Sequence, residues 1–358
     1  MNKKLLVVGI AAALAAPLAA QAGVEVYGDA RLSLDFVNNN DNTAGNKDST
    51  ISLSSNYSNI GFKGDEDLGA GMSVLWQIEQ EVQFDTGAWG TAARDTYVGL
   101  GSGWGRVLAG HMQTPYRVAT QRLDPFTDTR ADYNAIIGST GNIGGAPYGL
   151  FNDENRASNA ISYVTPDMGG FNAAVMYVMS DALGSDNLPK TSAANDRDAY
   201  SLSGAYNNGP IFATIAYEAV TKAGISAAGE DATAWKIGGS YTLMNALTIG
   251  ALYENIDLGG TVGDRNAYGV SASYMMGSTT FMAAYNAADD SSTTSSGASQ
   301  YSIGVKQALS KNTEVYALWT QVSNDDNAAY SLDNTPGVVG GQDMSAFSFG
   351  INHMFSSK

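Results

Sequence analysis

Apolar and polar side chains alternate along many segments of this chain, each about ten residues long. Residues 346–355 show the pattern most clearly, with small or polar side chains on one face. The opposite face carries Phe347, Phe349, Ile351, His353 and Phe355. Successive side chains of a β-strand point to opposite faces, so this segment predicts a strand with one apolar and one wettable face. A soluble sandwich also uses such strands, but their repetition and the export leader described below favour a transmembrane β-barrel.

The alternation recurs in sixteen segments separated by short turns or by longer polar loops. We predict strands at residues 24–36, 50–64, 72–84, 94–100, 106–112, 156–165, 170–180, 198–207, 210–220, 232–243, 246–257, 265–276, 278–287, 299–308, 312–323 and 344–355. Proline is scarce, with 8 residues, as expected for sheets, because it lacks a backbone donor. The predicted fold is all-β: a 16-stranded antiparallel transmembrane β-barrel, wide enough for a water-filled lumen.

The first 22 residues have the features of a secretory leader. Lys3 and Lys4 give a positive start, residues 5–18 are mostly apolar, and Ala20-Gln21-Ala22 forms a small-residue cleavage site. We therefore expect residues 1–22 to be removed and residues 23–358 to form a single barrel domain. No later segment has 18 consecutive apolar residues, so no helical membrane span is expected.

Charge and cysteine content exclude several function classes. Lys3 and Lys4 are the only charged residues of the leader, so the chain's 19 basic residues fall to 17 against 35 acidic ones, a net charge of −18. A nucleic-acid partner is not expected, because it needs clustered lysine and arginine. The absence of cysteine removes disulfides and thiolate chemistry. The two histidines lack partners at metal-ligand spacing, so neither a metal site nor a cofactor is expected.

Several stretches resemble Gram-negative general porins, the trimeric diffusion channels of the outer membrane. The resemblance lies in their order and spacing and extends over essentially the whole mature chain. It rests on Val26-Tyr27-Gly28-Asp29-Ala30-Arg31-Leu32, residues 59–69, residues 94–110, Met112-Gln113-Thr114-Pro115-Tyr116 and the terminal aromatic strand. The chain departs from the family at Asn59 and at His111, where the family often has arginine, and in the three residues that follow Phe355.

The resemblance implies that residues 113–155 fold inward as a constriction loop. It also implies basic side chains on the facing wall, at Arg31, Arg94 and Arg156, and a homotrimer. It further implies that the terminal strand, with Phe347, Phe349, Ile351 and Phe355, presents the chain to the barrel assembly machinery. The alternation independently places Arg31 on the polar face of the first strand.

Charged residues are frequent in the predicted constriction loop. The candidates are Arg117, Arg122, Asp124, Asp128, Arg130 and Asp132. In one interpretation, loop acids face the wall arginines across the pore and create a transverse field that selects ions. In the other, these charges pair with one another and hold the loop, or the wall arginines pair with neighbouring strands. The sequence does not decide which of Asp124, Asp128 and Asp132 faces the pore.

The expected function is passive diffusion of ions and small hydrophilic solutes through a channel in the bacterial outer membrane, in contact with lipid and lipopolysaccharide. The net charge favours cations at the channel mouth, although a ring of arginines at the narrowest point would reverse this. A substrate-specific channel is the nearest alternative. A barrel hydrolase is the other, but the chain has no G-x-S-x-G elbow, so we expect no enzymatic activity.

Overall fold

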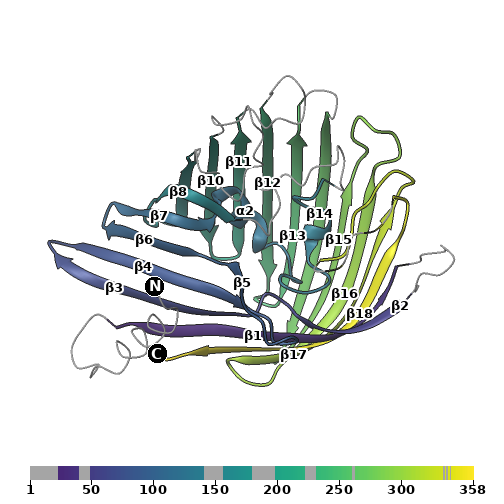
Figure 1. Ribbon diagram of the computed structural model, residues 1–358, viewed down its shortest axis with the longest axis horizontal. Helices are drawn as coiled ribbons and strands as arrows, with labels where there is room; N and C mark the ends of the chain where they lie inside the picture. Colours follow the sequence, from purple (N-terminus) through teal and green to yellow (C-terminus); the bar gives the residue numbers. More distant parts are fainter. Residues whose placement is uncertain are drawn as a thin grey trace, which may run out of the picture.

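The first and last strands of the chain lie side by side and close one antiparallel sheet into a barrel (Figure 1). In the computed structural model, β1 (Glu25–Asn38) pairs with β18 (Met344–Ser356) from Tyr27 opposite Ser356 to Asn38 opposite Ser345. The structure describes residues 23–39, 49–140, 156–179, 198–221, 231–259, 263–333, 335, 338 and 340–358. The expected leader, residues 1–22, lies outside this range. Within it, no helix is long and apolar enough to cross a bilayer.

Eighteen strand segments of the described chain form sixteen strands of the barrel. The segments after β1 are β2 (Ser49–Ser55), β3 (Asn59–Gly69), β4 (Met72–Val82), β5 (Trp89–Ala93), β6 (Thr96–Ser102), β7 (Gly105–Gln113), β8 (Arg156–Val164), β9 (Phe171–Val178), β10 (Ala199–Asn208), β11 (Ile211–Val220), β12 (Ala232–Leu243), β13 (Leu247–Asp257), β14 (Asp264–Met276), β15 (Thr279–Ala288), β16 (Ala298–Ala308), β17 (Thr313–Asn324) and β18. Because β2 and β3 both pair with β1, and β5 and β6 both pair with β4, each couple is one barrel strand. The predicted sixteen strands are confirmed.

The two faces of the strands differ as the alternation predicts. On β18, Phe347, Phe349 and Ile351 are exposed on the outside of the barrel, whereas Ser348 is fully buried on the inside. Exposed apolar side chains recur on the outer face of the other strands, among them Ile215, Ile237, Ile249, Val270, Phe281 and Ile303. An apolar outer band of this kind is what a barrel needs in order to sit in lipid.

The connections are short at one end of the barrel and long at the other. Two-residue turns join β3 to β4, β6 to β7, β10 to β11 and β14 to β15. Several need a glycine with positive φ, as at Gly209 (55°) and Gly277 (64°). Residues 83–88 and 289–297, longer connections that the structure describes in full, lie at the opposite end, in line with the asymmetry typical of an outer-membrane barrel.

The second barrel strand is interrupted, which the sequence did not predict. Tyr57 has a φ of 56°, and the strand breaks between β2 and β3. The Ser58 hydroxyl accepts from the Arg31 N–H at 2.9 Å and donates to the Arg31 carbonyl at 2.8 Å, so it replaces the missing ladder bonds. Between the predicted strands 72–84 and 94–100 we expected a loop up to about residue 93. This prediction was wrong for its last part, because Trp89–Ala93 is strand β5.

Candidate functional site

The segment after β7 packs against inward-facing side chains of the barrel wall. We call residues 114–140 the lumen segment; residues 141–155 of the expected constriction loop lie outside the described part. The segment contains α2 (Pro115–Gln121), whose N-terminus is capped by Thr114, and a short 3-10 turn at Tyr133–Ala135. Figure 1 shows α2 within the outline of the barrel.

The inner wall holds the lumen segment by hydrogen bonds, among them one each from β13, β14 and β16. From β13, Glu254 accepts from the hydroxyl of Tyr116 at 2.8 Å. The other two bonds run from the wall to carbonyls of the segment: Ser271 of β14 donates to Leu123 at 2.6 Å, and Gln300 of β16 donates to Asp132 at 3.0 Å. These contacts fix the segment against one side of the barrel.

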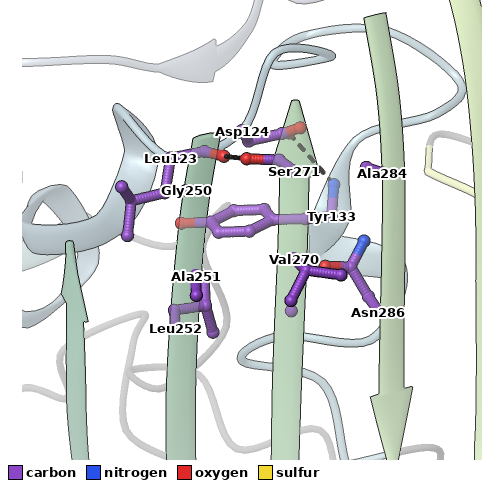
Figure 2. A pocket seen from close by; sticks show the side chains of 11 residues that line it. Leu123, Asp124, Tyr133, Gly250, Ala251, Leu252, Val270, Ser271, Ala284 and Asn286 are labelled. Carbon is purple, nitrogen blue, oxygen red and sulfur yellow. Dashed lines mark hydrogen bonds between the residues drawn. The ribbon is translucent and has the colours of Figure 1, made fainter. Parts of the chain in front are cut away.

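The inner wall beneath the lumen segment is partly apolar. Leu123, Ile136 and Ile137 are buried in one cluster with the inward residues Phe212 and Leu252. Figure 2 shows Leu123, Asp124 and Tyr133 gathered against Leu252 and Ser271. The wall has a glycine, with no side chain, where the segment comes closest. A Cβ added to Gly238 would lie 2.5 Å from Leu123 Cδ1. Hydrophobic burial therefore adds to the hydrogen bonds that hold the segment.

A buried acid joins both limbs of the lumen segment to the wall. Glu254, fully buried, accepts from the Gly138 N–H at 2.8 Å in addition to Tyr116. Arg265 of β14 lies 3.0 Å from the same carboxylate and donates to the Ile136 carbonyl at 3.1 Å. Because Tyr116 is near the start of the segment and Gly138 near its end, Glu254 acts on both limbs.

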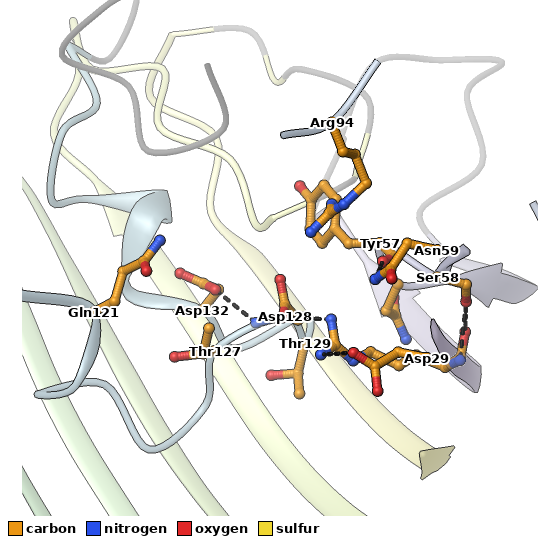
Figure 3. A network of polar contacts seen from close by, with 12 residues as sticks. Asp29, Tyr57, Ser58, Asn59, Arg94, Gln121, Thr127, Asp128, Thr129 and Asp132 are labelled. Carbon is orange, nitrogen blue, oxygen red and sulfur yellow. Dashed lines mark hydrogen bonds and ion pairs between the residues drawn. The ribbon is translucent and has the colours of Figure 1, made fainter. Parts of the chain in front are cut away.

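The three arginines expected on the pore wall all pair with carboxylates. On β1, Arg31 pairs with Asp29 at 2.9 Å and also with Asp128 of the lumen segment. Figure 3 shows Asp29, Asp128 and Asp132 near one another, with Arg94 on the neighbouring wall.

The other two wall arginines pair with acids of the wall itself. Arg94 pairs with Glu79 of β4, which also accepts from the Tyr27 hydroxyl at 2.8 Å. Arg156, at the start of β8, lies 2.7 Å from Asp95. The first pair joins neighbouring barrel strands, as in the second of the two interpretations given above, whereas the second pair reaches across β7.

The acids of the lumen segment differ in their partners. Asp124 and Asp132 accept backbone N–H groups of the segment: Asp124 from Phe126 and Tyr133, and Asp132 from Asp128 and Asn134. Both carboxylates are buried, so they shape the segment. Burial, and then the negative charge of Asp124, raises the pKa of Asp132 well above its usual value. Asp128 is the acid whose side chain stays 28% exposed beside the wall.

The basic residues of the lumen segment make other contacts. Arg130 is buried, and its Nε lies 2.8 Å from Asp35 of β1. Arg117 is buried in α2. Arg122 donates to Asn207 at 2.9 Å and lies over the ring of Phe212.

Polar exposure inside the barrel is uneven. Side chains near β1–β8 keep some exposure, 24% at Asp95 and 28% at Asp128. Opposite, under the lumen segment, Glu254 and Arg265 have 0% and 3%. Solvent therefore reaches Asp95 and Asp128, beside the wall arginines, more than it reaches the Glu254–Arg265 pair. Among the described residues, no three His, Asp or Glu side chains gather as metal ligands would.

Sequence reasoning missed the acids that pair with the wall arginines and the Glu254–Arg265 pair. A usable signal existed at Glu254, since it occupies an inward position between the apolar inward residues Leu252 and Ile256. A charge in such a row needs a buried partner. No comparable signal assigns Glu79 to Arg94, because their pairing depends on the register between two barrel strands.

Comparison with known proteins agrees with the fold. The Gram-negative porin family matches residues 7–327. The chain is 28% identical over 369 residues to outer membrane porin protein 32 of Delftia acidovorans, which covers 99% of this chain and 100% of that protein. It is 27% identical over 220 residues to major outer membrane protein P.IB of Neisseria gonorrhoeae. That alignment covers 60% of this chain and 56% of that protein.

Solved structures show the same barrel. An anion-selective porin from Comamonas acidovorans superposes with a TM-score of 0.78 at 24% identity, covering 94% of this chain and 100% of that one. A trimer form of OmpT from Vibrio cholerae superposes with a TM-score of 0.65 at 16% identity, covering 94% and 100%. By sequence and by fold, the chain belongs to the Gram-negative porin family and is a channel protein of the outer membrane.

Proposed function

We propose that the protein is a passive diffusion channel for ions and small hydrophilic solutes, and that the lumen segment is its constriction. The observation that carries this proposal is the packing of the lumen segment against inward-facing residues of β13, β14 and β16, while Asp95 and Asp128 beside the wall arginines stay 24% and 28% exposed. Solutes would pass beside the Arg31–Asp128 pair, along the wall that bears Arg94 and Arg156. The mechanism needs no covalent step, because the closed sheet satisfies its own hydrogen bonds and the lumen supplies water.

We propose a weak preference for cations. Each wall arginine is paired, and the carboxylates in these pairs, Asp29, Asp128, Glu79 and Asp95, outnumber the three arginines. The local charge is therefore slightly negative, in the same direction as the net charge of the mature chain. Selection for anions, as named for the Comamonas structure, would need arginines without such partners.

Measurements in a planar bilayer test both the channel function and the preference for cations. Purified protein is inserted and measured under a salt gradient. Stable conductance steps support the channel, and their absence contradicts it. A reversal potential on the cation side supports the selectivity, and one on the anion side overturns the selectivity alone.

We also propose a homotrimer, removal of residues 1–22 on export, and recognition of the strand containing Phe347, Phe349, Ile351 and Phe355 by the barrel assembly machinery. The trimer is supported by the Vibrio structure named as a trimer form. The recognition strand is supported by its exposed aromatic face. The mass of the purified complex in detergent, measured by light scattering, tests the trimer: a monomer mass contradicts it.

A further inference from the structure

Part of the connection between β17 and β18 also packs into the interior of the barrel. We call residues 325–333 the outer loop. Its base is organised by Asn324, which donates to the carbonyls of Tyr330 and Gln342 at 2.8 and 2.7 Å and accepts from the Tyr330 N–H. Within the loop, Ala328, Tyr330 and Leu332 are all at most 1% exposed. Such burial shows a packed element rather than a solvated loop.

The outer loop packs in the same apolar cluster as the lumen segment. Tyr330 and Leu332 belong to the cluster that contains Ile136 and Ile137. The cluster also includes Met344 of β18, so it joins both loops to the wall. Apolar packing by itself is not directional, and it would allow the two loops to slide.

Arg130 supplies a directional connection at this junction. Its Nε lies 2.8 Å from Asp35 of β1, its Nη2 donates to Ser54 of β2 at 2.6 Å, and its Nη1 donates to the Asp333 carbonyl at 2.9 Å. One guanidinium thus contacts two wall strands and the outer loop. Asp333 is held a second time, because its carboxylate accepts from the Tyr57 hydroxyl at 2.9 Å. Tyr57 is the residue at the break between β2 and β3.

We propose that the outer loop is a second element that sets the aperture of the channel, and that Arg130 is the positioning residue that locks it to the lumen segment and the wall. The proposal rests on the channel function proposed above. The planar guanidinium suits this role, since its donors point in fixed directions and it stays charged. Loss of Arg130 leaves Asp35 buried without its counter-charge, so the junction should open rather than collapse.

Cysteine accessibility tests the lock without relying on conductance. The natural chain has no cysteine, so one introduced thiol reports alone. Ala328→Cys places it at a fully buried position of the outer loop. We expect slow labelling by a membrane-impermeant thiol reagent, and labelling about tenfold faster or more once Arg130→Gln is added, because the loop opens locally. Arg130→Lys keeps the charge, but an ammonium group cannot reach Asp35, Ser54 and Asp333 at the same time, so this variant should give an intermediate rate.

Ala216→Cys is the matched control. Ala216 is 2% exposed on β11 and lies in a different apolar cluster. Faster labelling at position 328 with an unchanged rate at 216 supports the lock. Equal acceleration at both positions shows general loosening and overturns it, as does an unchanged rate at 328. If Arg130→Gln does not fold, Tyr57→Phe removes the second contact to Asp333 and should still accelerate labelling at 328.

Single-channel conductance then connects the lock to the aperture. Arg130→Gln should raise the conductance and add rapid fluctuations relative to the natural chain. Unchanged conductance together with faster labelling at 328 overturns the aperture role. Absence of conductance in the natural chain contradicts the channel function, while the labelling still decides whether the lock exists.

Discussion

Arg31 of the barrel wall and Asp128 of the lumen segment form a direct ion pair at the accessible side of the lumen. Arg31 also pairs with Asp29, so two carboxylates share one guanidinium. The wall and the segment therefore meet in contact here, and the charge left over for passing ions is negative. The proposed preference for cations rests on this small imbalance between carboxylates and arginines.

Asp128→Asn should shift the permeability ratio toward anions. The change removes one negative charge and leaves the size of the side chain almost unaltered. A unit charge acts on an ion about 4 Å away by about 1 kcal/mol in water, so the shift should be at most about fivefold. Reversal potentials of the variant and the natural chain under the same salt gradient measure it. A shift toward cations would contradict the assignment of Asp128 to the pore.

Glu254→Ala should destabilise the folded channel strongly. Arg265 would remain buried without its carboxylate, at a cost of about 3–5 kcal/mol. Tyr116→Phe is the matched control, since it removes only one hydrogen bond to Glu254, about 1 kcal/mol. Unfolding in denaturant, followed by the loss of β-sheet signal, compares the two. Equal effects would show that Glu254 does not hold both limbs of the lumen segment.

Asp132 should make the channel less stable as pH rises. Its raised pKa means that the folded chain keeps a proton that the unfolded chain releases above about pH 4. The free energy of unfolding therefore falls with pH from that point until the folded pKa is passed. Asp132→Asn has no proton to lose, so its unfolding should lack this part of the slope. Thermal unfolding of both proteins across this range is the measurement, and parallel slopes would refute the prediction.

Deleting Ser356, Ser357 and Lys358 should weaken the closure between β1 and β18. The Ser357 N–H donates to the Val26 carbonyl at 2.9 Å, and its hydroxyl accepts from the Val26 N–H at 3.0 Å. Each such bond contributes about 1 kcal/mol, so the unfolding temperature should fall by several degrees. Deleting Lys358 alone is the control, because its exposed pair with Glu25 at 4.0 Å contributes little. Equal unfolding temperatures for both deletions would contradict the prediction.

The barrel was predictable because its signal has a period of two residues. Leu34 and Phe36 outside, with Ser33 and Asp35 inside, follow directly from the alternation. The break at Tyr57 was not predictable, since a positive φ at tyrosine has no sequence signature and the missing ladder bonds are replaced by a serine hydroxyl. The strand β5 was missed because it is only five residues long.

Much of the candidate site depends on register and loop packing, which local patterns do not encode. The pairing of Arg156 with Asp95 requires two distant segments to arrive at one height in the barrel. The inward fold of the outer loop had a weak signal in Tyr330 and Leu332, two large apolar residues in an otherwise polar stretch. Polar composition masked it, because long polar loops of such barrels usually lie outside.

The neighbours β1 and β18 come from opposite ends of the sequence, which constrains the order of folding. Tyr27 and Ser356 are ladder partners, so the ring stays open until the last strand has left the ribosome. Joining such distant residues carries a large entropic cost and makes folding slow. Until then the chain exposes two unpaired edges and a row of apolar side chains, which are prone to aggregation. Pairing of β1 with β18 is therefore the step that removes both edges at once and ends this exposure.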